Sequence, residues 1–286
     1  VKAFAYGSGG YEIAHFFQSQ RTVDYLVVAY ADEGILLREK GINLRIMVMS
    51  PSKTSYESMI QHELEPEIYS LNALKDFIRA ARSMRHFFER YPVHLKLDSG
   101  MHRLGFHQRE LSEALKIIQA SPFVSVASIF THLSATDEAT HDGFTREQIA
   151  RFEVMNTKVI STLGYQPDRH VLNSTGVLRF PEYHFEMVRL GIGLYGFSGN
   201  EENRFLNALG SLKSYIVQIR EVDAGDSVGY ARKGRADASR RVATVALGYA
   251  DGLDRRLSDG NWDVLWQGIP CPIIGNVCMD MTMIDV

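Results

Sequence analysis

The sequence has few cysteines, little net charge and no long hydrophobic run, and each lack excludes a class of protein. Its 286 residues include two cysteines, Cys271 and Cys278, which are too few for a disulfide scaffold. We therefore expect a reducing, cytoplasmic location, and we expect no metal site because no metal-ligand spacing accompanies the two thiols. A net charge of −3 without a long basic run argues against a nucleic-acid partner. No apolar stretch approaches the roughly 20 residues of a membrane helix, so we expect no membrane association.

The rest of the composition is typical of a globular protein. Hydrophobic residues make up 45% and charged residues 23% of the chain, which is enough for a sizeable core. The length fits one large domain or two ordinary ones. The chain starts at Val1 without a methionine, and residues 283–286 stop inside an apolar, strand-like run. We therefore expect a fragment of a longer chain, truncated at both ends.

Residues 1–200 alternate short apolar runs with helical patterns, which include residues 72–90 and 145–163. Strand–helix alternation repeated about eight times predicts an α/β fold of the (β/α)8 TIM-like barrel type. A doubly wound open sheet is the competing interpretation. The expected strands are Val1–Ala5, Tyr25–Tyr30, Leu44–Met49, Leu64–Tyr69, Val93–Leu97, Val126–Thr131, His170–Asn173 and Met187–Leu194.

Residues 201–286 have a different rhythm. Short β-like runs follow one another there, separated by glycine and aspartate turns. This pattern predicts a second, mostly β domain that is incomplete at its C-terminal end. The expected strands are Ser214–Ile219, Arg241–Leu247, Val264–Trp266 and Ile273–Val277.

The ends of the expected barrel strands carry cationic and hydrogen-bonding groups, and active residues follow the carboxyl ends of strands in such barrels. These groups are Lys2, Tyr6, Lys96, Arg103, His132, Ser174, Arg189 and the backbone near Gly191. Together they suit an anionic ligand, above all a phosphate. A buried strand lysine costs free energy unless it is paired or reactive, and a lowered pKa makes it a nucleophile for carbonyls. A lysine such as Lys2 beside a phosphate site therefore indicates pyridoxal 5'-phosphate (PLP) as the cofactor.

Several ordered motifs resemble those of the alanine racemase family. The first is Val1-Lys2-Ala3-Phe4-Ala5-Tyr6-Gly7, and the second runs from Lys96 to Gly105 as KLDSGMHRLG. Others are Thr131-His132-Leu133-Ser134, Asn173-Ser174, VRLGIGLYG at 188–196, SVGY at 227–230, GYADG at 248–252 and Cys278-Met279-Asp280. Each motif alone is weak, but their order and their spread over almost the whole chain make the set specific.

The resemblance implies a PLP-dependent isomerase that interconverts L- and D-alanine, supplying D-alanine for peptidoglycan. It implies that Lys2 binds the cofactor covalently and is one of two acid/base catalysts, and that Tyr230 is the other, on the opposite face of the cofactor. It implies a homodimer in which the partner subunit contributes this tyrosine. Arg189 would bond to the pyridine nitrogen, and His132 would link Arg189 to Tyr230.

The resemblance also implies the binding residues. The phosphate would be held by Tyr6, Ser174, Tyr249 and the backbone of Gly191 and Ile192. Arg103 and the Met279 backbone would bind the substrate carboxylate, beside Tyr230. Lys96 matches a lysine that is often carbamylated in relatives.

Three alternatives remain open at this point. A non-catalytic PLP carrier has a similar barrel and lysine but lacks a β domain, so the residues after 212 argue against it. A fold-type III decarboxylase has a different pyridine-nitrogen partner, so Arg189 argues against it. A racemase of broader specificity stays open, because a single sequence does not define the pocket around the substrate Cβ.

Overall fold

The computed structural model describes residues 1–85, 88–199 and 201–286. The chain forms two compact units, Val1–Leu209 and Gly210–Val286. Each unit is described by itself below.

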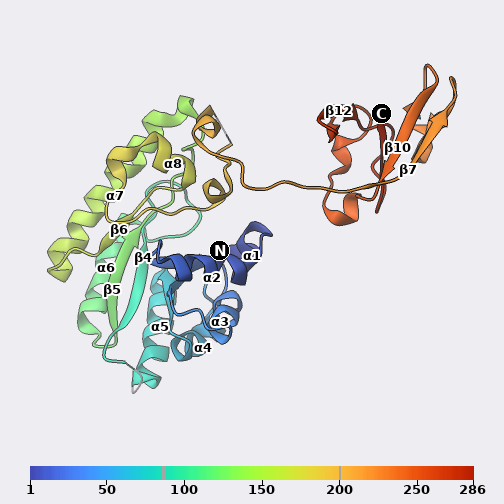
Figure 1. Cartoon of the computed structure of the whole chain (residues 1–286). Helices are drawn as coiled ribbons and strands as arrows, with labels where there is room; N and C mark the ends of the chain where they lie inside the picture. The colour runs from blue at the N-terminus through green and yellow to red at the C-terminus, as the bar shows by residue number, and fades with distance from the viewer. Residues whose placement is uncertain (86–87, 200) are drawn as a thin grey trace. The chain divides into compact units, whose positions relative to one another are not determined.

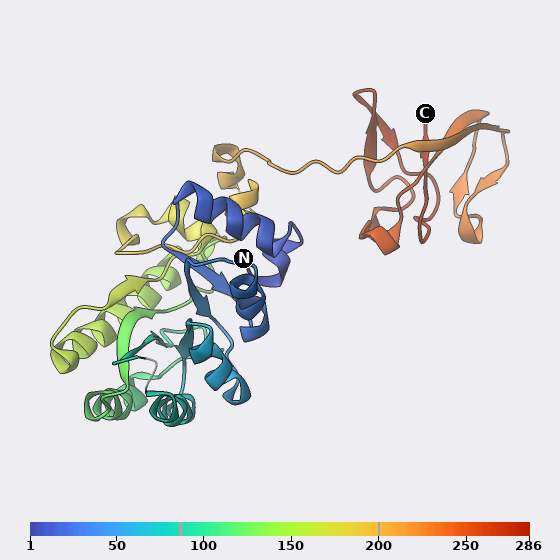
Figure 2. The same ribbon diagram turned by 60° about the horizontal axis from the view of Figure 1, so that its bottom comes forward.

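The described part of the first unit is built on a parallel sheet whose strands lie in sequence order, β1 to β6. The strands are β1 Tyr25–Val28, β2 Arg45–Val48, β3 Leu64–Ile68, β4 Tyr91–Lys96, β5 Val124–Phe130 and β6 Asp168–His170. The helices are α1 Lys2–Tyr6, α2 Gly10–Gln20, α3 Ala31–Glu39, α4 Tyr56–Gln61, α5 Leu71–Ser83, α6 Gln108–Ala120, α7 Asp142–Leu163 and α8 Ser174–Arg179. Strand and helix alternate along the chain, and the helices lie around the outside of a curled sheet (Figures 1 and 2). The predicted α/β, TIM-like barrel class is confirmed, as a partial barrel.

The two faces of this sheet differ in chemistry because side chains two apart on a strand share a face. The outer face packs on the helices in one apolar cluster, which includes Leu95, Ile129, Phe77, Leu115 and Phe152. Full burial of such a side chain contributes about 1.5–3 kcal/mol. The inner face is polar and buried: it carries Glu65 and Glu67 from β3, His94 and Lys96 from β4, Ser128 from β5 and His170 from β6. The helices therefore stabilise the sheet from outside and leave its interior for polar chemistry.

The expected strand Val1–Ala5 is wrong. The segment forms the short helix α1, in which Ala3, Phe4 and Ala5 have φ of 52–53°. Its amides bond locally, from Ala5 N to Val1 O at 2.9 Å and from Gly7 N to Ala3 O at 3.1 Å, so it does not join a ladder. The Glu33 carboxylate fixes the turn by accepting a hydrogen bond from Ala3 N at 2.6 Å.

The expected strand Met187–Leu194 is also wrong. The backbone amides of Met187 and Arg189 donate to the carbonyls of Arg169 and Leu172, so this segment runs beside β6. It then turns into a 3-10 helix, Ile192–Tyr195, whose N-terminal neighbour Gly191 has φ −124° and ψ −105°. The turn ends the extended run before a strand can form.

Two other boundaries differ from the sequence pattern. Strand β6 ends at His170 instead of Asn173, because the Asn173 side chain accepts a hydrogen bond from Gly176 N and so starts α8. Of the helical pattern predicted at residues 72–90, α5 covers Leu71–Ser83, and residues 86–87 lie outside the described residues. The pattern at 145–163 is confirmed in α7.

The second unit is β-rich, as predicted. Its described strands are β7 Ile216–Val222, β8 Ser227–Val228, β9 Gly234–Arg235, β10 Arg240–Val245, β11 Asp263–Trp266, β12 Ile269–Pro272 and β13 Thr282–Asp285. Strand β10 pairs antiparallel with β7 and β13, and β11 pairs with β12. The core of this unit consists of Ala243, Val245, Cys271, Ile273, Val277 and Ile284.

The expected strand Ile273–Val277 is wrong. Ile273 makes a single bridge to Ile284, and the chain then turns at Gly275, where φ is 71°. A side chain at Gly275 would put its Cβ 2.6 Å from the Val228 carbonyl oxygen. This close approach between two backbones requires glycine and ends the extended run.

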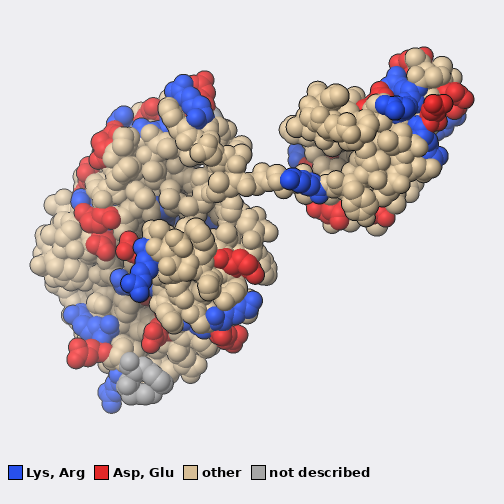
Figure 3. Space-filling view, viewed as in Figure 1, with Lys and Arg blue, Asp and Glu red and all other residues tan. Residues whose placement is uncertain are grey.

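Basic and acidic side chains are intermixed over the face of the first unit seen in Figure 3. Several of them form exposed ion pairs, such as Arg146 with Glu182 at 2.6 Å. Exposed pairs of this kind contribute about 0–1 kcal/mol each. Within the described ranges, no helix is both long enough and apolar enough to cross a membrane.

Candidate active site

The Arg189 guanidinium lies at the centre of the polar interior of the first unit. It donates to His170 O at 2.7 Å, Thr131 O at 2.9 Å and Val171 O at 3.2 Å, and to His170 Nδ1 at 2.9 Å. Burial lowers the pKa of Arg189 to about 10, although Glu67 opposes this shift. Arg189 therefore remains charged at neutral pH, and its hydrogen bonds fix its orientation.

His132 lies beside this guanidinium and is surrounded by cations. Its Nδ1 accepts from Arg189 Nη2 at 3.4 Å. Burial lowers the pKa of His132 to about 3, and the charges of Arg189, Arg103, Lys96 and Lys2 add to the effect. The structure thus brings four sequence-predicted cations within electrostatic reach of one neutral imidazole.

Three of the positions predicted to hold a phosphate, Tyr6, Ser174 and Gly191, lie together in the first unit. Ser174 Oγ accepts from Gly191 N at 2.9 Å and from Gly193 N at 3.1 Å. The Tyr6 hydroxyl lies over Gly191, since a Cβ built there would be 2.4 Å from it. Burial and the neighbouring Tyr195 raise the pKa of Tyr6, so its hydroxyl keeps its proton. Hydroxyl groups and backbone amides therefore surround Gly191, which has no side chain of its own, and such groups suit an oxyanion.

Lys96 is buried and ion-paired. Its Nζ lies 3.0 Å from Glu67 Oε1 and 5.5 Å from the centre of the Phe130 ring. Glu67 is fully buried, and its Oε2 has no hydrogen-bond partner among the described residues. Burial raises the pKa of Glu67 to about 7, against the attraction of Lys96, Arg189 and Arg103.

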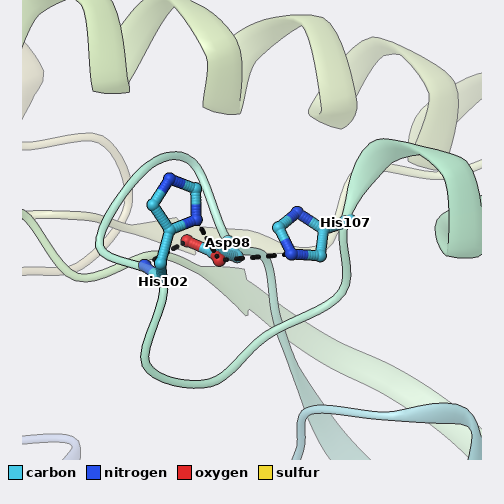
Figure 4. Close-up of side chains that lie close together, drawn as sticks. All are labelled: Asp98, His102 and His107. Atoms are coloured by element: carbon cyan, nitrogen blue, oxygen red, sulfur yellow. Dashed lines mark hydrogen bonds and ion pairs between the residues drawn. The ribbon is translucent and has the colours of Figure 1, made fainter.

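Arg103 lies on a loop that leaves β4 and returns to it. The Asp98 carboxylate organises this loop, because its Oδ1 accepts from Gly100 N and His102 N at 3.0 Å each. Its Oδ2 faces His102 Nδ1 at 3.1 Å and His107 Nε2 at 3.8 Å (Figure 4). Although burial opposes it, these hydrogen bonds hold the pKa of Asp98 below its usual range. The loop is therefore pinned at its base, with Arg103 exposed between its two histidines.

The remaining predicted site residues belong to the second unit. Tyr249 N donates to Cys278 O at 2.9 Å, and Ala250 N donates to Met279 O at 2.8 Å, so Tyr249 and Met279 lie side by side. Tyr230 starts a short 3-10 helix after Gly229, and its carbonyl accepts from the Asn276 side chain at 3.1 Å. The Tyr230 side chain is 71% exposed.

The polar residues of the inner face were not predicted from the sequence. They lie within runs that the sequence analysis treats as apolar strands, and they are Glu65, Glu67, His94, Ser128 and His170. The signal was present as polar residues two apart, Glu65 with Glu67 and His94 with Lys96, which is the spacing of one strand face.

Comparison with known proteins follows the same division of the chain. The family model "Alanine racemase, N-terminal domain" matches residues 1–199, and "Alanine racemase, C-terminal domain" matches residues 209–286. Alanine racemase 1 of Oceanobacillus iheyensis is 34% identical over 292 residues, which cover 100% of this chain and 76% of that protein.

Solved structures agree. Alanine racemase from the D-cycloserine producer Streptomyces lavendulae matches with a TM-score of 0.91 and 29% identity, covering 100% of this chain and 76% of that one. The Bacillus anthracis enzyme, with bound L-Ala-P, matches with a TM-score of 0.86 and 31% identity, covering 100% and 74%. These matches identify an isomerase of the amino-acid racemase type. The chain belongs to the alanine racemase family.

Proposed function

We propose that this protein racemises alanine with PLP as its cofactor. The observation that carries the proposal is the arrangement around Arg189: a fixed, buried cation next to a neutral His132, with Lys2 in electrostatic reach. When bound, PLP withdraws electrons from the substrate Cα and so acidifies its proton. A permanent cation, as opposed to a carboxylate, at the pyridine nitrogen would keep that nitrogen unprotonated. This would moderate the electron withdrawal and limit side reactions.

The residues present fit the phosphate of PLP. The absence of a side chain at Gly191 leaves room beneath the Tyr6 hydroxyl, where a Cβ would be only 2.4 Å from the oxygen. Tyr6 and Ser174 offer hydroxyl groups, and Ile192 offers a backbone amide next to them. Donors of this kind bind phosphate oxygens well. Tyr249 of the second unit would add a further hydroxyl.

Racemisation requires that a proton leave one face of Cα and return to the other. In this proposal Lys2 Nζ takes or gives the proton on one face, and the Tyr230 hydroxyl does so on the other. Arg103 and the Met279 backbone would orient the substrate carboxylate, so that the Cα–H bond points at one of these two bases. In this proposal His132, which accepts a hydrogen bond from Arg189, would orient the Tyr230 hydroxyl through a second hydrogen bond.

We also propose a homodimer in which each site uses Tyr230 of the partner subunit. Phe4 and Leu190 are exposed on the first unit, as are Tyr230 and Met279 on the second unit. In this proposal dimer formation covers exposed apolar side chains of both units. In this proposal residues 1–200 bind the cofactor, residues 201–286 supply the second base, and the two free cysteines favour a cytoplasmic location.

The test is to incubate the protein with PLP and L-alanine in D2O and follow optical rotation together with the Cα proton. We expect rotation to decay to zero while deuterium enters Cα. Lys2→Ala should lose both signals, and Lys213→Ala, which removes an exposed lysine of the second unit, should keep them. Binding of PLP to lysine without deuterium exchange would instead indicate a PLP carrier. Equal rates with larger amino acids would indicate a racemase of broader specificity.

A further inference from the structure

A chain of buried hydrogen bonds crosses the inner face of the sheet, from β6 to β3, and ends on Arg189. Arg189 Nη1 lies 2.9 Å from His170 Nδ1, and His170 Nε2 lies 2.9 Å from Ser128 Oγ. Ser128 Oγ lies 2.6 Å from His94 Nδ1, and His94 Nε2 lies 3.0 Å from Glu65 Oε2. Glu65, His94, Ser128 and His170 are each at most 6% exposed.

The two ends of this chain fix its direction. A guanidinium can only donate, so His170 Nδ1 must accept from Arg189. The single ring proton of neutral His170 then lies on Nε2 and is donated to Ser128 Oγ. The Ser128 hydroxyl in turn donates to His94 Nδ1, and His94 Nε2 donates to Glu65, which as a carboxylate only accepts. Every link is satisfied in one direction only.

The neutral state of His170 agrees with its surroundings. Burial holds the pKa of His170 well below its ordinary value, and the charge of Arg189 adds to this. The ring also stacks on Phe130 with a centroid distance of 4.7 Å and an interplanar angle of 8°. The ring is thus held in one plane, and the hydrogen-bond chain decides which nitrogen faces Arg189.

Glu65 is a firmly anchored anion. Arg45 binds it through Nε at 2.9 Å and Nη2 at 3.1 Å, and the Tyr25 hydroxyl donates to Oε2 at 3.0 Å. Although burial alone would raise the pKa of Glu65, its bonds with His94 and Arg45 hold that pKa below the usual range. Glu65 therefore stays ionised as the terminal acceptor of the chain.

We propose that Glu65, His94 and Ser128 are positioning residues for the racemase site: together they select the Nε2–H tautomer of His170, whose free Nδ1 then orients the Arg189 guanidinium. The inference rests on the proposed function, since the orientation of Arg189 matters for catalysis only where Arg189 faces the cofactor. The three residues touch neither cofactor nor substrate in this proposal. They act through His170, because the hydrogen bond made by one ring nitrogen determines the state of the other.

The first experiment measures the protonation of the histidine rings and needs no activity. The full-length protein is labelled with 15N-histidine, and the ring nitrogens are assigned with His94→Gln and His170→Gln. We expect both rings to be neutral, with the proton on Nε2, whether or not PLP is bound. A proton on Nδ1 of His170, or a doubly protonated ring at either position, would overturn the proposal.

The second experiment breaks the chain at its centre. Ser128→Ala removes the hydroxyl without changing charge, so His170 loses the acceptor for its Nε2 proton and gains access to the other tautomer. We expect mixed tautomers in the spectrum, a shifted absorbance of the lysine-bound cofactor, and a kcat about tenfold lower, since His170 Nε2 loses its acceptor and His94 Nδ1 loses its donor. KM for alanine should change much less, because Arg103 is untouched. Ser128→Thr, which keeps the hydroxyl, should restore the tautomer and most of kcat.

The matched control is Ser125→Ala, the same substitution on the same strand but outside the chain. It should leave the tautomer, the absorbance and kcat unchanged. If the wild-type protein racemises alanine but Ser128→Ala keeps both the His170 tautomer and kcat, the positioning role is wrong and the proposed function stands. If the wild-type protein neither binds PLP nor racemises alanine, the proposed function fails. The 15N spectrum of the wild-type protein still shows whether the hydrogen-bond chain sets the tautomers of His94 and His170.

Discussion

The neutral state of His132 makes a quantitative prediction about the pH dependence of stability. Burial and four nearby cations lower its pKa from 6.5 to about 3 in the folded protein. The unfolded chain takes up a proton as pH falls below about 6.5, whereas the folded chain does not until about pH 3. His132 therefore contributes stability that is present above pH 6.5 and is lost as the pH falls towards 3.

The size of this loss follows from the linkage relation. pH 5 lies about 1.5 units below the ordinary pKa of 6.5, so protonation of His132 stabilises the unfolded chain and not the folded chain. Each unit corresponds to about 1.36 kcal/mol, so the stability lost is about 2 kcal/mol. His132→Asn removes the titrating ring while its amide oxygen can still accept from Arg189. Between pH 7.5 and pH 5 the wild-type protein should therefore lose about 2 kcal/mol more stability than His132→Asn.

Urea denaturation at the two pH values, with equal cofactor loading, measures this difference. His141→Asn is the matched control, because it removes an exposed imidazole that faces Glu138 and should keep the wild-type dependence. If the free energy of unfolding falls equally for the wild-type protein and His132→Asn between the two pH values, the reasoning is refuted. An NMR titration in which the His132 ring takes up a proton above pH 6 would refute it independently.

Three further predictions concern the rest of the pocket. Ser174→Ala leaves two backbone amides without their acceptor and should cost about 2–4 kcal/mol in urea denaturation, whereas an unchanged midpoint would contradict the described bonds. Gly191→Ala should weaken PLP binding measured by absorbance titration, because its Cβ meets the Tyr6 hydroxyl. Tyr6→Phe in the same chain should relieve that contact, so PLP binding by the double variant that equals that of Gly191→Ala would contradict the prediction. Lys96 should remain a free ammonium, because a carbamate would place a second anion beside Glu67, so 13C NMR after equilibration with 13C-bicarbonate should show no carbamate carbon.

Much of the fold could be predicted because its elements have strong periodic patterns. Helix α7 follows the pattern at residues 145–163, and the apolar runs at 25–30 and 93–97 became β1 and β4. The pattern failed where local bonds outweigh it. Val1–Ala5 is apolar apart from Lys2, but its amides bond within the segment and to Glu33. Met187–Leu194 is extended only as far as Gly191, where the chain turns.

The candidate site was predictable only in part. Lys2, Tyr6, His132, Ser174 and Arg189 stand in local motifs. In the structure Arg189 contacts His132, and both Tyr6 and Ser174 lie against Gly191. The supporting residues come from different strands and carry no local motif, so one sequence does not reveal that they meet. Their contacts depend on strand register, for example on His94 lying opposite Ser128, which no local pattern specifies.

The one-way hydrogen-bond chain has a consequence for how this sequence can change over time. An obligate donor at one end and an obligate acceptor at the other leave no link free to reverse, so each group inherits its orientation from its neighbour. A replacement at any one link must reproduce both a donor and an acceptor, or the next link must change with it. Substitutions along this path should therefore occur in compensating pairs. The sequence of the polar interior should change more slowly than that of the apolar layer outside it, and several residues should change together.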